Sequence, residues 1–69
     1  MPDEATMYRT RAATERQSAL ATPLDNVRDR CIRAAKAWEA MADRAERVDT
    51  QRRQREAATT ARAEVVDAA

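Results

Sequence analysis

Apolar residues recur at alternating spacings of three and four over residues 24–48, and this pattern predicts one long amphipathic helix. The repeated positions form an unbroken heptad seam, which is typical of a helix that packs along another helix. After Val48 the same spacing falls on arginine and threonine instead of apolar residues, so the seam ends there. Ala35 and Ala42 widen the seam on one side. The seam consists of Leu24, Val27, Cys31, Ala34, Trp38, Met41, Ala45 and Val48.

The segment "ATPLD", residues 21–25, is the clear interruption of the helical pattern. Proline disfavours helix at the preceding residue but suits the first position of a new helix. Thr22 is therefore the predicted N-cap and Pro23 the first residue of the second helix. The first helix is predicted at about residues 3–21. Because the connection is short and strand patterns are lacking, the sequence predicts an all-α fold, an antiparallel two-helix hairpin with a short first and a long second helix.

The first helix carries a weaker stripe of small residues, which is expected to face the seam. If the first helix folds back along the second, Tyr8 lies near Ala34 and Ala35, and Ala5 lies near Trp38. Alanine alone encloses an indole poorly, because a Trp side chain can bury about 150–250 Å². We therefore expect Trp38 and Met41 to pack against another chain, with the seam and Tyr8 as the interface of a helical bundle. The stripe comprises Ala5, Tyr8, Ala12, Glu15 and Ala19.

Charges are sorted on the two flanks of the seam. The basic flank has Arg30, Arg33, Arg44 and Arg47, and the acidic flank has Asp25, Asp29, Glu39, Asp43 and Glu46, with Lys36 as an exception. One interpretation is a solvated helix with pairs four residues apart, such as Asp29–Arg33 and Asp43–Arg47. The alternative is that two copies align with basic flank against acidic flank, which would set their orientation.

The chain divides into a hairpin at residues 1–48 and a different segment at residues 49–69. The second segment favours helix by propensity but has no continuing apolar face, and isolated helices are marginal in water. We expect a helical extension that frays to a disordered tail.

Size and composition favour an interaction module of unknown pathway that self-associates or docks on a protein partner. The chain has 69 residues and much of its apolar content is alanine, so a sufficient core is hard to form alone. A chain that folds only on binding is a further possibility. The alternative function is a small nucleic-acid-associated protein, although a net charge of +1 argues against a general polyanion binder. Its phosphate contacts would be Arg44, Arg47, Arg52, Arg53 and Arg55.

The residue inventory predicts neither an enzyme nor a metal or cofactor site. Histidine and glycine are absent, and Cys31 is the single cysteine, which suits a small core residue. No apolar run approaches the roughly 20 residues that span a bilayer. An unpaired thiol suits a reducing compartment, so a soluble cytoplasmic protein that binds no membrane is expected.

Residues 26–47, "NVRDRCIRAAKAWEAMADRAER", carry a resemblance. They resemble short uncharacterised bacterial helical proteins that share an Asn-Val-Arg start and an Ala-Trp-x-x-Met-Ala centre. The resemblance covers 22 of the 69 residues. It implies that the hairpin is a recurring unit, and it implies no activity.

Overall fold

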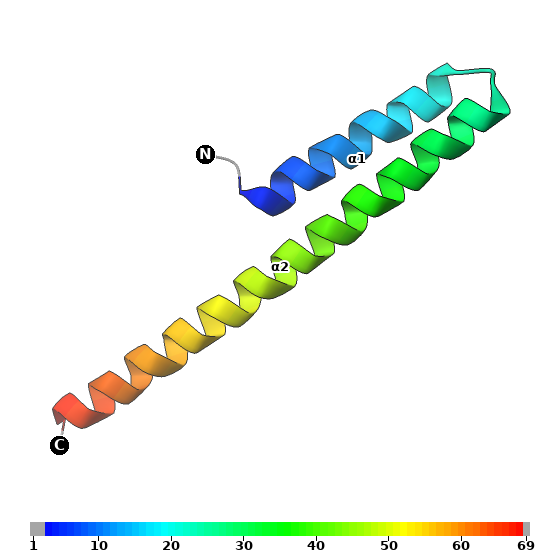
Figure 1. Ribbon diagram of the computed structural model, residues 1–69. Coiled ribbons are helices and arrows are strands. Elements are labelled where there is room, and N and C mark those ends of the chain that lie inside the picture. The colour runs from blue at the N-terminus through cyan, green and yellow to red at the C-terminus, as the bar shows by residue number, and fades with distance from the viewer. Residues whose placement is uncertain (1–2, 69) are drawn as a thin grey trace.

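Two antiparallel helices make up the computed structural model, which describes residues 3–68 (Figure 1). Helix α1 spans Glu4–Ala21 and helix α2 spans Asp25–Ala68, with residues 22–24 as the connection. The predicted all-α hairpin with a short first and a long second helix is confirmed. The molecule extends over 68 Å, and its radius of gyration of 19.3 Å far exceeds the about 11 Å of a compact domain of this length.

Local hydrogen bonds fix the N-terminal end of each helix. Asp3 caps α1, because its carboxylate accepts from the Thr6 backbone N–H at 2.8 Å. At the connection, the Thr22 hydroxyl accepts from the Leu24 N–H at 3.2 Å. The first α2 bond then runs from the Arg28 N–H to the Leu24 carbonyl at 2.9 Å. Helix α2 therefore begins at Asp25, two residues after the predicted start at Pro23.

The hairpin contact is made mainly of alanine. On α1, Ala5, Ala12 and Ala19 are buried at seven-residue intervals, with Tyr8 and Glu15 half-buried between them, which confirms the predicted stripe. The buried residues of α2 are Cys31, Ala35 and Ala42.

The predicted seam of α2 is buried only in part. Cys31 is buried and Val27, Ala34, Trp38 and Ala45 are half-buried, whereas Leu24, Met41 and Val48 are exposed. Ala35 and Ala42, which were placed beside the seam, are the most completely buried residues. Helix α1 thus packs about one position to the side of the predicted seam, because small side chains allow its backbone to approach closely there.

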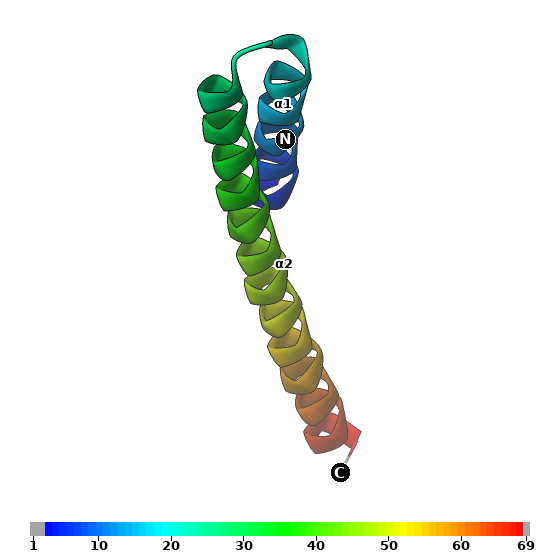
Figure 2. The same cartoon turned by 90° about the vertical axis from the view of Figure 1, so that its right-hand side faces the viewer.

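Helix α2 continues far beyond its partner. Figures 1 and 2 show α1 beside only the first part of α2, and the rest of α2 stands alone. Every residue in 51–65 is exposed. The predicted helical extension is present, and the fraying to a disordered tail is not seen in the described residues, since the helix runs to Ala68.

Candidate protein-binding face

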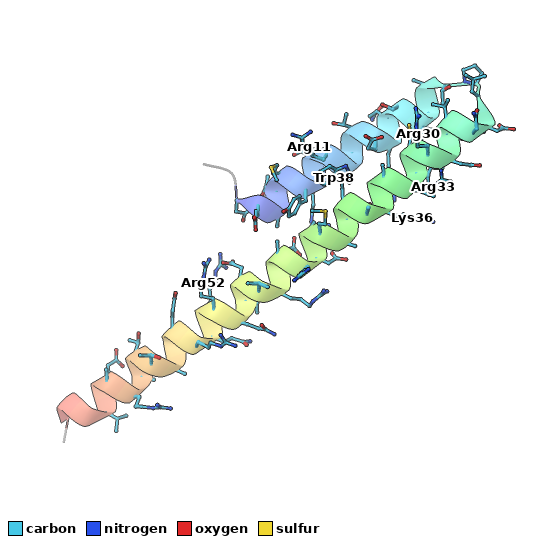
Figure 3. All side chains as sticks on the ribbon, viewed as in Figure 1. Arg11, Arg30, Arg33, Lys36, Trp38 and Arg52 are labelled. Atoms are coloured by element: carbon cyan, nitrogen blue, oxygen red, sulfur yellow. The ribbon has the colours of Figure 1, made fainter. Side chains whose placement is uncertain are left out.

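Trp38 is covered by α1 of its own chain. The Tyr8 ring stacks on the Trp38 ring with 5.8 Å between centroids and 27° between planes. The Arg11 guanidinium lies 5.6 Å from the centroid of the same ring, a cation–π arrangement. Figure 3 labels Arg11 on α1 close to Trp38, which lies between the two helices. Trp38 is half-buried by these contacts, so the expectation that it packs against another chain does not describe its main neighbours.

The position of Tyr8 also corrects the predicted register. Tyr8 meets Trp38, about one helical turn farther along α2 than the predicted Ala34 and Ala35. Tyr8 lies 13 residues before Ala21 and Trp38 lies 13 residues after Asp25, so the observed helix ends place the two rings at the same level. The start of α2 at Asp25 instead of Pro23 therefore accounts for most of the shift. Ala5 accordingly lines a groove with Met41 and Ala45.

Ion pairs between the helices lie on the acidic flank of α2. Arg9 donates to Glu46 at 2.9 Å and to Asp43 at 3.1 Å, and Arg16 donates to Glu39 at 2.6 Å. Hydrogen bonds from Arg16 lower the pKa of Glu39, and the carboxylates raise the pKa values of Arg9 and Arg16. All of these groups are exposed to solvent, so the pairs set the register more than they stabilise the fold.

Sequence reasoning missed these arginines of α1, although a signal was present. Arg9 and Arg16 are seven residues apart, as are Glu39 and Glu46. Matched heptad spacings of opposite charge are typical of paired helices. Asp43 binds Arg9, so the expected Asp43–Arg47 pair is not formed, and neither is Asp29–Arg33 among the described side chains.

A row of apolar residues on α2 is left uncovered by α1. We define the apolar stripe as Val27, Ala34, Met41 and Val48, which share seven-residue spacing. Val27 and Ala34 are half-buried, while the Met41 and Val48 residues are 42% and 56% exposed. Leu20 and Leu24 add exposed apolar surface at the connection. These members of the predicted interface are therefore available to a partner.

A shallow groove lies where the N-terminal end of α1 meets α2. Its apolar lining includes Ala5, Tyr8, Met41, Ala45 and Val48. Charged residues line it as well: Asp3, Glu4, Arg44, Glu46, Asp49 and Arg52. The groove includes Met41 and Val48 of the apolar stripe, so it extends the same uncovered surface.

The five arginines of the nucleic-acid alternative do not form one cluster. Arg52 and Arg53 both bind Asp49, at 2.7 Å and 2.9 Å. Arg44, Arg47 and Arg55 are exposed, and the described side chains offer them no ion pair. Two of the five predicted phosphate contacts are thus already engaged by a carboxylate.

Three findings concern the cysteine, the metal-ligating side chains and the hydropathy of the described residues. Cys31 is buried against α1, as expected of a small core residue. Residues 3–68 hold no cluster of three or more metal-ligating side chains. Nor does either helix, over its described length, combine the length and apolar character needed to cross a bilayer.

Comparison with known proteins returned no similarity on which a family could be assigned. No family model, no curated protein and no solved structure matches this chain.

Proposed function

We propose that this protein is a helical interaction module whose uncovered side of α2 docks on a protein partner. One observation carries the proposal: the core is too small for the apolar surface that the chain displays. The buried apolar residues are five alanines and Cys31, and no large side chain is fully buried among the described residues. Burial of larger apolar side chains is the main driving force of folding, so this hairpin gains little from its internal contact.

The uncovered surface has the form that a helical partner requires. The apolar stripe repeats every seven residues, which is the period that keeps one side of a helix against another helix. Met41 lies near the middle of the apolar stripe. The groove that Met41 and Val48 line makes one end of the stripe concave. Trp38 contributes only the part of its ring that Tyr8 and Arg11 leave open. The proposed interface is therefore centred on Met41 instead of Trp38.

The nucleic-acid alternative is less well supported. Arg52 and Arg53 are paired with Asp49. The single tyrosine and the single tryptophan stack on each other, and segment 51–55 itself contains no aromatic residue on which a base could stack. The arginines left for phosphate contact are Arg44, Arg47 and Arg55.

Site-specific photo-cross-linking in the cells that make the protein tests this proposal. A photoreactive amino acid at Met41 or Val48 should give a discrete cross-linked product. The same amino acid at Ala13 or Gln17, which are exposed on α1, is the matched control and should give none. Light scattering on the purified chain then distinguishes a second copy from a different protein. A cooperatively melting monomer with no product from Met41 or Val48 would overturn the proposal.

A further inference from the structure

Arginines line α2 along a face that contains no carboxylate. All eight acidic residues of α2 up to Val65 fall on the side that includes the contact with α1: Asp25, Asp29, Glu39, Asp43, Glu46, Asp49, Glu56 and Glu64. By helical spacing, six arginines lie beside the apolar stripe, and two of them, Arg33 and Arg47, border the acidic flank because they follow Asp29 and Asp43 by four residues. This arginine face consists of Arg30, Arg33, Arg44, Arg47, Arg55 and Arg62. It runs for about 48 Å at 1.5 Å per residue, and all six residues are exposed.

The arginine face lacks internal compensation. Arg33 points away from α1 in Figure 3. None of the six arginines forms an ion pair with a side chain that the structure describes. Meanwhile Arg9 and Arg16 of α1 occupy Asp43, Glu46 and Glu39 on the other side. The hairpin therefore pairs three carboxylates of its acidic flank with α1 and leaves the basic flank open.

A second copy fits this surface poorly. In a two-fold dimer the same patch meets itself, so the arginine faces of both copies would lie together. The opposite arrangement, basic flank against acidic flank, requires carboxylates of which α1 already binds three, Glu39, Asp43 and Glu46. Such a head-to-tail contact closes into a ring or continues into a filament. The ion pairs of the hairpin thus leave fewer carboxylates for the basic flank of a second copy.

We propose that the arginine face and the apolar stripe together dock an acidic amphipathic helix of a different protein. The inference rests on the proposed function, because it names the partner of the same surface. Arg30 and Arg44 are fourteen residues apart, as are Arg33 and Arg47. That separation is two heptads, so carboxylates at one heptad position of a partner helix can meet both pairs while its apolar residues cover the stripe.

The spacing of the two arginine pairs favours a helix over a nucleic acid as the partner. Ala37 and Ala40 separate the two arginine pairs and let a second helix backbone approach closely. Met41 and Val48 offer apolar side chains that a phosphate backbone does not bury. A partner helix with Leu at its seam and Glu on its flank satisfies both the charge and the apolar surface.

The probe is a synthetic 28-residue helical peptide with Leu at heptad positions a and d and Glu at e and g. A peptide with Lys in place of Glu, and one with Gln in place of Leu, are its controls. Binding to the full chain is measured by titration calorimetry at about 150 mM salt, where distant charges are screened. The Glu peptide should bind, and both control peptides should not. A 20-base-pair DNA duplex and an RNA of equal length are titrated alongside.

Two protein variants with equal loss of charge locate the site. Arg44→Gln/Arg47→Gln should weaken binding of the Glu peptide at least about tenfold. Arg28→Gln/Arg53→Gln, on the acidic side where these arginines pair with Asp25 and Asp49, should change it less than about twofold. Circular dichroism confirms that both variants keep the helical hairpin.

The outcomes separate this inference from the proposed function. Equal weakening by both variants, or duplex binding as tight as peptide binding, overturns the acidic helix as partner. A dimer in light scattering that Met41→Glu dissociates supports docking through the stripe but overturns a different protein as occupant. A monomer that binds no peptide and gives no cross-link from Met41 overturns both proposals.

Discussion

Tyr8 of α1 stacks on Trp38 of α2, with 5.8 Å between ring centroids, so the single tyrosine and the single tryptophan of the chain join the two helices. In a hairpin whose buried residues are alanine and cysteine, this is the largest apolar contact between the helices. Arg11 adds a cation over the indole ring. The aromatic pair therefore supplies specificity that an alanine interface lacks.

A double-mutant cycle on Tyr8 and Trp38 should reveal this contact. Tyr8→Ala and Trp38→Ala should each lower the free energy of unfolding, with a coupling of about 0.5–1.5 kcal/mol. Urea unfolding followed by circular dichroism gives these values. Tyr8→Phe keeps the stacked ring and is the control, expected to behave like the natural chain. The Trp38 fluorescence should shift to longer wavelength in Tyr8→Ala; a coupling near zero with an unshifted spectrum would contradict the stacked pair.

Close approach at alanine makes the hairpin sensitive to larger side chains. Ala42 has 0% exposure, so Ala42→Leu should cost about 1–3 kcal/mol in the free energy of unfolding because the helices must separate. Ala40→Leu is the matched control, since Ala40 is exposed on the same helix. Urea unfolding of the two variants checks the difference. Equal stability of both would mean that α1 does not pack on Ala42.

Much of this hairpin could be predicted from the sequence, because its signals are local. Pro23 marks the connection, and the stripe of Ala5, Ala12 and Ala19 shows which side of α1 is buried. The heptad pattern of residues 24–48 indicates the long second helix. These features depend on backbone preference and on period, which a single chain displays directly.

The details of the contact could not be predicted in the same way. Counting from a second helix that starts at Pro23 places Tyr8 short of Trp38, because α2 starts two residues later, at Asp25. The large seam residues suggest the buried side of α2, yet Ala35 and Ala42 occupy it because α1 approaches closest over small residues. The basic flank can be seen in the sequence, but the exposure of Met41 emerges only when α1 is in place.

Acid should destabilise the hairpin through Asp3 and Glu39. Hydrogen bonds from Thr6 lower the pKa of Asp3, and those from Arg16 lower the pKa of Glu39. A carboxylate whose folded-state pKa is depressed adds stability that is complete above its ordinary value and is lost as pH falls through the folded-state value. The ordinary values are 3.8 for Asp3 and 4.5 for Glu39, so stability from these groups should be level above pH 4.5 and decrease below it.

Thermal melts of Glu39→Gln and the natural chain between about pH 7 and pH 2.5 check this effect. Glu39→Gln should be less stable at neutral pH and should lose less on acidification, because its amide does not titrate. Glu64→Gln, on the exposed extension, is the control and should follow the natural chain. Identical pH profiles for Glu39→Gln and the natural chain would exclude a contribution from the Arg16–Glu39 pair.

Removing residues 56–69 should leave the hairpin stable. Among the described residues, the hydrogen bonds from α1 to α2 reach no farther along the chain than Glu46, and the charge that acts on the cap residue Asp3 is that of Arg53. The exposed residues beyond that point pack on nothing, so the melting midpoint of the shortened chain should stay within about 4 °C of the full chain. Its helical signal per residue should change little, because the deleted segment and the rest are both helical.

A second, longer truncation is the comparison for this experiment. Ending the chain at Met41 removes Ala42, Asp43 and Glu46, which α1 contacts through the alanine interface and through Arg9. Helices this short are marginal without a packed neighbour, so this chain should lose its cooperative melt. A large drop in midpoint after removal of 56–69 alone would show that the extension folds against a surface, most simply that of another molecule, and light scattering at several concentrations would then identify it.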